Sequence, residues 1–301
     1  MSARETRDRF VFSRRDYCLS LPHVGHPLSV PGLGTTLLAR PIPGSGRSDL
    51  VGPWPYTAAP EPALLERALA ALRQDGFVSL TMFLRPDTAA GHVAALGGVA
   101  DVVPLKDHYI RDPRQPPPAI RARTRRNLAI AERHWRIRAL ARAEIPPLCG
   151  PWQDQLAARR RLSDYARVGP EHFAAIARLD AVEAMAAEDD DGPGAVLVAA
   201  RAGDETHLLH FLTTPRVIPT CGSYLLWDRA LRAWSRDGRV YLGGAPGAED
   251  GPGIARFKAR WANRTAPAFL LKAVLDGGAY RALAGRSPAR SFFPAYRDAP
   301  A

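Results

Sequence analysis

The stretch from Gly222 to Trp261, GSYLLWDRALRAWSRDGRVYLGGAPGAEDGPGIARFKARW, indicates the fold of this chain. Apolar residues recur at helical spacing over 223–236, which predicts a helix with one buried face. The apolar residues at 240–242 predict a strand that ends at two glycines, and a second short helix is expected over 253–261. The order helix, strand, helix predicts an α/β domain.

The residues on either side of this stretch extend the same pattern. The second half of the chain predicts two helices, a hairpin and a last strand beyond the second short helix, at about 151–165, 170–187, 195–201 with 206–213, and 268–274. The order in this half is therefore α-α-β-β-α-β-α-β.

The first half repeats this order more loosely. Residues 1–60 are rich in Pro and Gly and predict short strands and loops. The following elements are expected at 63–74 (helix), 77–84 (strand), 88–96 (helix), 99–105 (strand), 118–134 (helix) and 136–140 (strand). We therefore expect two similar α/β (α+β) domains in tandem, 1–140 and 141–301, each with a mixed sheet flanked by helices.

Length and composition place the chain among ordinary globular proteins. It has 301 residues, of which 46% are hydrophobic and 24% charged, enough to bury a core. No run approaches the roughly 18 apolar residues that cross a bilayer, and residues 1–9 lack an apolar signal core. The three cysteines form neither a disulfide framework nor a zinc pattern. We expect a cytoplasmic protein, with peripheral membrane contact left open.

The chain is strongly basic, with a net charge of +11, 38 arginines and only 3 lysines. A positive surface attracts polyanions such as tRNA, nucleotide cofactors or phospholipid head groups. On the helix expected over 118–134, Arg121 and Arg125 lie one turn apart and are candidates for substrate binding. The alternative is a connecting helix with a solvated basic face.

Two positions in the opening stretch are candidates for binding a donor molecule. At the first, Cys221 and Gly222 precede a helix, where backbone N–H groups and the helix dipole favour an anion, Gly222 allows close approach and Ser223 is expected to cap the helix. The alternative is an ordinary capped core helix, and capping alone is a weak signal. At the second, Gly243 and Gly244 at a strand end allow the strand to part from its neighbour or a ligand to approach.

Three motifs in this order resemble the C-terminal half of the Fem-type (FemAB-like) proteins, tandem members of the GNAT superfamily of acyltransferases. They are Ser223-Tyr224-Leu225-Leu226-Trp227-Asp228, Tyr241-Leu242-Gly243-Gly244 and Ala255-Arg256-Phe257-Lys258-Ala259-Arg260-Trp261. Arg121-Ala122-Arg123-Thr124-Arg125-Arg126-Asn127-Leu128 is similar to the helix that leads out of their first domain. Asp49-Leu50-Val51-Gly52-Pro53-Trp54-Pro55-Tyr56 stands where such proteins often have a Pro- and Gly-containing loop. Together these matches span roughly residues 50 to 280.

The resemblance implies transfer of an acyl group from acyl-CoA, or of an aminoacyl group from aminoacyl-tRNA, to an amine acceptor on a small molecule or peptide. It implies that Lys258, in the Phe-Lys pair, stabilises charge near the reacting ester, and we place Tyr241 among the substrate-binding candidates. No metal is expected. Acceptor-binding residues and a coiled-coil arm known in some members have no match here, so the acceptor stays open.

The chemistry of such a transfer needs few catalytic groups. A thioester or aminoacyl ester is already activated, so positioning the amine and stabilising an oxyanion supply most of the acceleration. Candidate bases for the amine proton are Glu249, Asp250 and His210. Solvated loop acids and a packed histidine are the alternatives.

Other patterns define rival hypotheses. His207 and His210 are three apart on a predicted strand, so we expect them on opposite faces, where they cannot share a metal. Cys221 at a helix start is a candidate nucleophile, as in a cysteine hydrolase. The arginine-rich helix is also compatible with a non-catalytic RNA-binding or scaffold protein on a degenerate GNAT fold.

Overall fold

The chain forms two compact units. The computed structural model describes residues 10–159, 167–236, 238–245, 251–285 and 292–297. The first unit comprises Met1–Leu105 with Pro267–Ala301, and the second comprises Lys106–Ala266. The expected boundary at 140/141 therefore falls inside the second compact unit, and two domains with the limits 1–140 and 141–301 stay a prediction.

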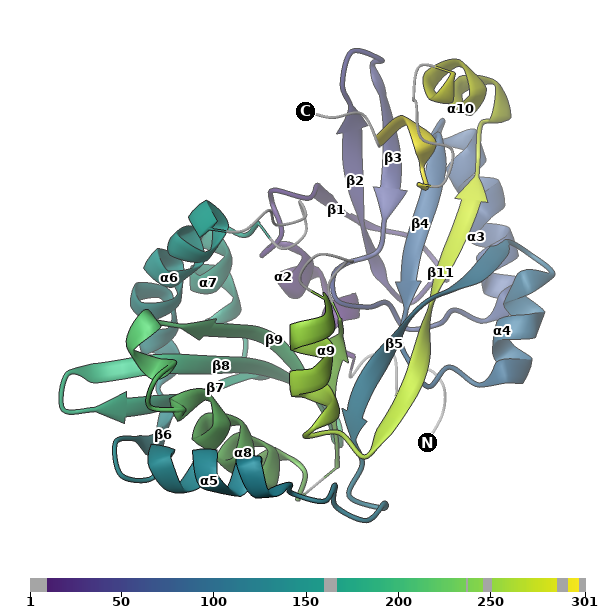
Figure 1. The fold of residues 1–301 in the computed structure, drawn as a ribbon. Coiled ribbons are helices and arrows are strands. Elements are labelled where there is room, and N and C mark those ends of the chain that lie inside the picture. The colour runs from purple at the N-terminus through teal and green to yellow at the C-terminus, as the bar shows by residue number, and fades with distance from the viewer. Residues whose placement is uncertain (1–9, 160–166, 237, 246–250, 286–291, 298–301) are drawn as a thin grey trace. The chain divides into compact units, whose positions relative to one another are not determined.

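The first unit is a mixed sheet with helices packed on it (Figure 1). Its strand order is β1-β2-β3-β4-β11, in which β3 and β4 are parallel and the other described pairs are antiparallel. The strands are β1 (His26–Ser29), β2 (Thr36–Ile42), β3 (Arg47–Val51), β4 (Ser79–Leu84) and β11 (Arg264–Val274), the last of which lies in this unit from Pro267. The helical segments are η1 (Val11–Ser13), α2 (Arg15–Cys18), α3 (Pro62–Gln74), α4 (Ala90–Gly97), α10 (Gly277–Ala284) and η4 (Ala295–Arg297).

Helix α3 shows how the sequence sets this packing. Pro62 suits the first turn because its missing N–H would have no partner there, and Leu65, Leu69 and Leu72 recur on one face. These leucines are buried against Leu80 and other sheet residues in one hydrophobic cluster.

In the described residues of the second unit, six strands form a sheet in the order β5-β10-β9-β8-β7-β6. They are β5 (Asp101–Arg111), which enters this unit at Lys106, β6 (Arg136–Leu140), β7 (Val182–Asp189), β8 (Gly192–Ala202), β9 (Glu205–Thr213) and β10 (Arg239–Gly244). Strands β9 and β10 are parallel, and the other described pairs of adjacent strands in this unit are antiparallel. The helical segments are α5 (Ala122–Ala131), η2 (Arg142–Glu144), α6 (Ile145–Arg159), α7 (Pro170–Ile176), η3 (Pro215–Val217), α8 (Gly222–Trp234) and α9 (Gly251–Ala259).

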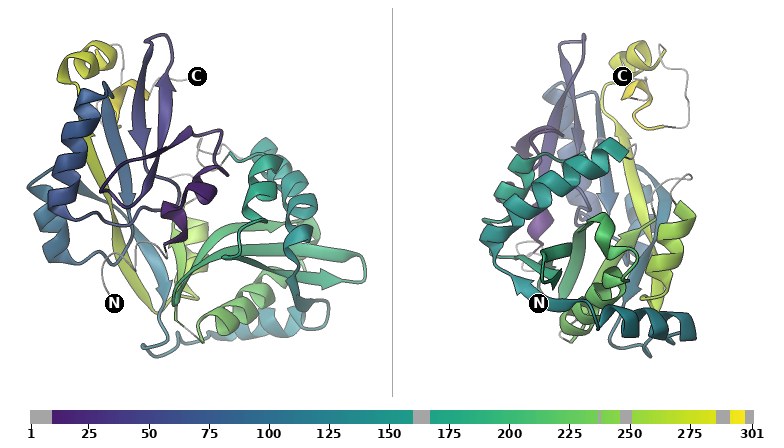
Figure 2. Two further views of the ribbon diagram at one scale, coloured as in Figure 1. Left: turned by 180° about the vertical axis from the view of Figure 1, so that it is seen from behind. Right: turned by 60° about the vertical axis from the view of Figure 1, so that its left-hand side comes forward.

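Helices cover both faces of the β6–β9 part of this sheet. Helices α5 and α8 lie on one face and α6 and α7 on the other, as the views in Figures 1 and 2 both show. The main hydrophobic cluster fills the face under α8, where Leu226 and Trp227 pack with Leu197, Ala199 and Leu242. Among the described helices, none has the length and apolar character needed to cross a bilayer.

One predicted element is wrong. The helix expected over 170–187 ends at Ile176, and Val182–Asp189 forms strand β7. Alanine-rich segments fit a helix locally, but here both edges of the segment pair with neighbouring strands, β6 and β8. Tertiary pairing thus overrides local helix propensity. The other expected helices and strands have counterparts among the described residues, and most of their ends agree within three residues. The helix expected over 151–165 corresponds to α6 (Ile145–Arg159), and residues 160–165 lie outside the described residues.

Candidate functional site

The parallel strands β9 and β10 part from each other after a short ladder. Their described pairing runs from Arg239↔Glu205 to Tyr241↔His207 and stops there. Both strands are irregular at this point: β9 has a bulge where Leu209 is inserted opposite Val198 and Ala199, and β10 shifts register between Tyr241 and Gly243. Beyond His207, the backbone of β9 therefore has no ladder partner on β10, which leaves a strand edge that an extended ligand can pair with.

Lys258 of α9 lies against the end of β10. Its Nζ donates a hydrogen bond to the carbonyl oxygen of Gly244 at 2.7 Å. Gly243 has a φ of 77°, and a Cβ at this residue would lie 3.2 Å from the same Nζ. Burial of the ammonium, with a smaller contribution from the charge of Lys106, lowers the pKa of Lys258 from 10.5 to about 8. The side chain is thus a half-buried cation whose proton exchanges close to neutral pH.

Lys106 and His108 of β5 lie beside the same glycines, and both escaped the sequence analysis. Lys106 Nζ is 3.5 Å from the carbonyl oxygen of Ala245, and a Cβ at Gly244 would lie 2.9 Å from the Lys106 chain and 3.0 Å from His108 Nε2. Burial, then the charges of Lys106 and Lys258, lower the pKa of His108 to about 3, so its ring is neutral at physiological pH. The sequence offered one signal for this pair. Lysine is rare in this chain, and Lys106 and His108 are two residues apart, so on a strand they share a face.

Tyr241, a substrate-binding candidate, is fully buried. Its hydroxyl donates to Glu205 at 3.1 Å, and the His207 ring stacks on its ring with 4.6 Å between centroids. Arg239 completes the group with an ion pair to Glu205 at 3.2 Å. These contacts account for the polar atoms of Tyr241 within the core, and substrate contact by this residue stays a prediction.

His210 and His207 lie on the same face of the sheet, so the expectation of opposite faces is wrong. The bulge at Leu209 adds one residue to β9, so that His210 pairs with Val198 while His207 pairs with Ala200. Residues two apart on β8 face the same side.

On that face, His210 contacts α7, where its Nε2 lies 2.9 Å from Nε2 of His172. Burial lowers the pKa of His210 well below 6.5. A role as base stays a prediction for His210, while Glu249 and Asp250 lie outside the described residues. The groups of His, Cys, Asp and Glu within those residues include none suited to a metal ion.

The start of α8 is occupied by an aromatic side chain. Cys221 is the N-cap residue, with a φ of 59° and no side-chain capping bond, and Ser223 is the second residue of the helix, so the expected cap by Ser223 is not formed. A Cβ at Gly222 would lie 2.9 Å from the ring of Trp135. The close approach that Gly222 permits is therefore that of the indole. Donor binding by Cys221, Gly222 and Ser223 stays a prediction.

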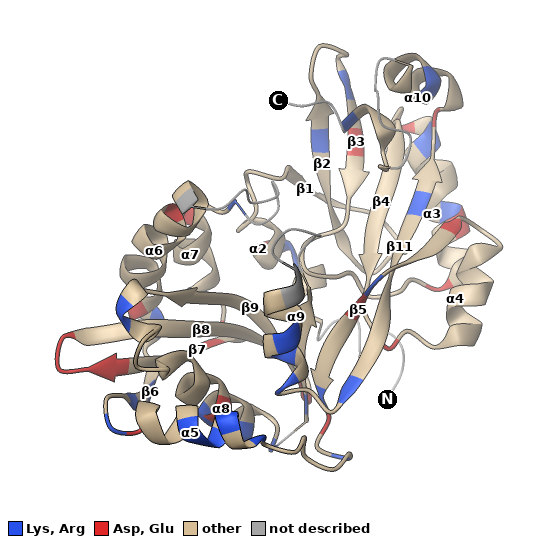
Figure 3. Cartoon of the chain, in the orientation of Figure 1, with Lys and Arg blue, Asp and Glu red and all other residues tan. Residues whose placement is uncertain are grey.

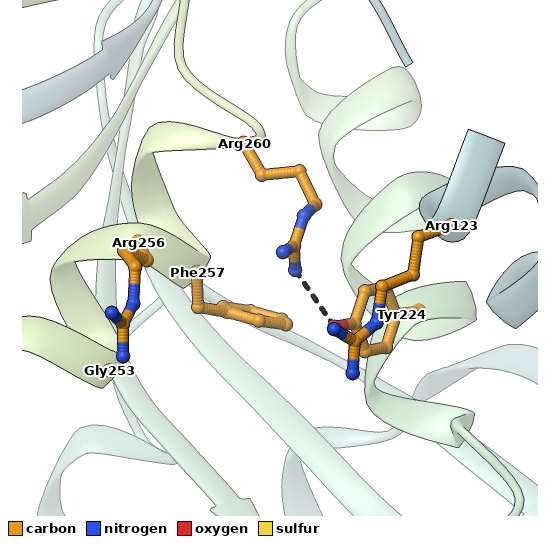
Figure 4. A pocket seen from close by; sticks show the side chains of 6 residues that line it. All are labelled: Arg123, Tyr224, Gly253, Arg256, Phe257 and Arg260. Carbon is orange, nitrogen blue, oxygen red and sulfur yellow. Dashed lines mark hydrogen bonds between the residues drawn. The ribbon is translucent and has the colours of Figure 1, made fainter. Parts of the chain in front are cut away.

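Three arginines and two aromatic rings line a pocket of about 440 Å³ (Figure 4). The lining residues come from α5, α8, α9 and the turn directly after α9, and are Arg123, Tyr224, Gly253, Arg256, Phe257 and Arg260. Arg260 donates to the Tyr224 hydroxyl at 2.8 Å, and its guanidinium lies 5.1 Å from the centre of the Tyr224 ring. We call this the arginine pocket. Its chemistry suits a flat or phosphorylated anionic ligand.

The elements that line the arginine pocket carry further basic residues. Lys and Arg residues, drawn in blue, recur along α5, α8 and α9 (Figure 3). The expected substrate-binding residues are both exposed: Arg121 is the N-cap residue of α5, and Arg125 lies on α5, where its Nη1 donates to the carbonyl of Ile120 at 2.6 Å. They do not line the pocket, whereas Arg123 from the same arginine-rich segment does.

The arrangement strand β9, helix α8, parallel strand β10, with the strands parting beside α9, defines the second unit as a GNAT-like fold. Solved structures agree. The chain is similar to FemX, with 9% identity, 94% of this chain and 98% of that chain covered, and a TM-score of 0.66. It is also similar to the C-terminal domain of a protein assigned as a lysylphosphatidylglycerol synthetase from Agrobacterium fabrum (15% identity, 92% and 94% covered, TM-score 0.60).

A third similar structure is L-PGS from Bacillus licheniformis, with 13% identity, 85% of this chain and 90% of that chain covered, and a TM-score of 0.51. The sequence itself matches no protein-family model and no curated protein. The chain therefore has the Fem-like GNAT fold, which confirms the fold expected from its motifs.

Proposed function

We propose that this chain is a GNAT-type transferase that moves an acyl group from acyl-CoA, or an aminoacyl group from aminoacyl-tRNA, to an amine. The observation that carries the proposal is the position of Lys258 at the point where β9 and β10 part. A half-buried ammonium there can donate a hydrogen bond to a carbonyl oxygen as it becomes an oxyanion, which is worth more in a site of low dielectric than in water.

The arginine pocket supports the same proposal because its cations suit the phosphates of a donor molecule. Both donor classes carry phosphates. Arg256 stands on the same short helix as Lys258, and Arg260 stands in the turn directly after it. Helix α9 and the residue that follows it thus present cations for donor phosphates and a cation for the donor carbonyl. The chemistry then consists of attack of the amine nitrogen on the carbonyl carbon, stabilisation of the oxyanion by Lys258, and departure of the thiolate or ribose oxygen.

The experiment measures donor consumption by the full chain. Acyl-CoAs are followed by thiol release and charged tRNAs by loss of the aminoacyl ester, each with small amines, peptides and phosphatidylglycerol vesicles as acceptors. The vesicles are included because one similar structure belongs to a protein assigned as a lysylphosphatidylglycerol synthetase. Absence of turnover with both donor classes and every acceptor contradicts an enzymatic function.

Lys258→Ala and Lys272→Ala form a matched pair of variants. Lys272 belongs to the first unit, where it pairs with Asp101 at 2.7 Å. We expect Lys258→Ala to lose about tenfold to a hundredfold in kcat/KM, the value of one hydrogen bond from a charged group, and Lys272→Ala to keep its activity. Full activity of a folded Lys258→Ala variant would show that Lys258 does not stabilise the oxyanion.

The many Lys and Arg residues on α5, α8 and α9 favour a second candidate, an RNA-binding protein without transfer activity (Figure 3). This alternative predicts RNA affinity that falls steeply with salt. Measured RNA binding with no consumption of either donor would select it. We place either activity in the cytoplasm, where tRNA and CoA esters are available.

A further inference from the structure

Two ammonium groups converge on the end of β10 from different elements. Lys258 of α9 reaches the carbonyl oxygen of Gly244 at 2.7 Å, and Lys106 of β5 approaches that of Ala245 at 3.5 Å. Neither lysine forms an ion pair in the described part of the chain. Like charges held close together without a counter-ion disfavour the doubly protonated state.

Among the charged groups around Lys258, Lys106 has the main effect on the pKa of Lys258. His108, also on β5, is neutral at physiological pH because its pKa is about 3. Strand β10 contributes backbone carbonyls, and α8 contributes Tyr224, whose hydroxyl accepts from Arg260. Arg256 of α9 and Arg260, the residue after this helix, line the arginine pocket. Glu249 and Asp250 lie outside the described residues.

The two lysines are not equivalent. Lys106 as a residue is exposed and Lys258 is half-buried. Protein atoms surround the Lys106 ammonium closely enough to lower its pKa by burial alone, whereas Lys258 responds to burial and to Lys106. The charge of Lys106, the more exposed of the two, therefore lowers the pKa of the half-buried Lys258.

We propose that Lys106 is a positioning residue for the transfer reaction, because its charge beside Lys258 makes the Lys258 ammonium a better proton donor near neutral pH. This inference rests on the proposed function. The role resembles that of a second cation beside a reactive lysine, which favours loss of the proton.

The protons of the reaction balance because Lys258 donates one proton and regains one. The amine nitrogen forms the C–N bond, and the Lys258 ammonium donates to the oxyanion. As the C–S or C–O bond breaks, Lys258 transfers a proton to the leaving sulfur or oxygen. The attacking nitrogen then returns its proton to Lys258, directly or through water. The products are the amide and the free thiol or hydroxyl, and Lys258 ends in its starting state.

The test measures the proton affinity of Lys258 without any turnover. The full chain is labelled at trace level with acetic anhydride between pH 6 and 11, and the acetylation of each lysine is read by mass spectrometry. The chain has only three lysines, so Lys272 serves as an internal reference. The variants are Lys106→Met, Lys106→Gln and the charge-retaining Lys106→Arg, each checked for its unfolding temperature.

We expect the labelling midpoint of Lys258 to rise by about half a pH unit or more in Lys106→Met and Lys106→Gln, and to stay unchanged in Lys106→Arg. The alkaline limb of the transfer activity should move by the same amount. An unchanged Lys258 midpoint in both neutral variants overturns the inference even if transfer occurs. A shifted midpoint without donor consumption instead refutes the proposed function and leaves the charge coupling demonstrated.

Discussion

Gly243 and Gly203 form a matched pair of positions for testing the placement of Lys258. Both have positive φ, 77° and 68°. A Cβ at Gly243 would lie 3.2 Å from Lys258 Nζ, whereas a Cβ at Gly203 would meet nothing within 4 Å. Substitution of either glycine by alanine imposes the same backbone cost, but only Gly243→Ala displaces the ammonium.

The magnitudes follow from these contacts. An alanine in the left-handed region costs about 1–2 kcal/mol, so both variants should lose a few degrees in Tm, since 1 kcal/mol is worth about 2–4 °C in a unit of this size. At Gly243 the ammonium must also move by several tenths of an ångström. A misplacement of 1 Å can cost about a hundredfold in rate, and the smaller shift should lower kcat/KM by about three- to tenfold.

The assay compares the two variants for thermal unfolding and for donor consumption with the best donor and acceptor. We expect equal losses of stability and a selective loss of activity in Gly243→Ala. The reasoning is refuted if Gly243→Ala keeps the activity of Gly203→Ala at equal stability, because the position of the ammonium would then be irrelevant to the rate.

Three further predictions concern the pocket, the pH profile and the start of α8. Arg260→Met should raise the KM for the donor by about tenfold, the cost of one lost charged hydrogen bond, while Tyr224→Phe, which keeps the ring, should raise it less; equal effects would exclude a phosphate contact by Arg260. Because the pKa of Lys258 is about 8, the ammonium is present below that pH and is lost above it, so transfer should fall as pH rises through about 8, and a rate that keeps rising to pH 10 contradicts Lys258 as proton donor. Gly222→Ala should destabilise the chain by about 1–3 kcal/mol in denaturant unfolding because its Cβ meets Trp135 at 2.9 Å, whereas Gly253→Ala, with open space around it, should not.

Helices with a strong apolar face were predictable from the sequence, and alanine-rich strands were not. Helix α8 was expected over 223–236 and occupies Gly222–Trp234, because large apolar residues at helical spacing are unambiguous. Strand β7 was missed because alanines at Ala184, Ala186 and Ala187 are small enough for either period. Only the partners β6 and β8, which pair with both edges of the segment, decide in favour of a strand.

The site was predictable where a residue type is informative and failed where the backbone is irregular. Lys258 stood out as a rare lysine in a motif. The shared face of His207 and His210 depends on the bulge at Leu209, and a one-residue insertion reverses every later side chain of a strand. Trp135 reaches Gly222 from the segment after α5, a long-range contact that no local pattern contains.

The Gly243-Gly244 pair and two of the three lysines form one structural unit. Each glycine leaves the volume that a lysine occupies: a Cβ at Gly243 would press on Lys258, and a Cβ at Gly244 would press on Lys106. The glycines therefore admit the lysines to the end of β10, and donor binding by Gly243 and Gly244 stays a prediction. In the proposed reaction a substrate carbonyl at this site would meet cationic side chains. A Gly244→Ala variant should disturb Lys106, while Gly243→Ala disturbs Lys258. Labelling of the individual lysines in these two variants would separate the effects, and identical labelling profiles would show that the glycines serve the backbone alone.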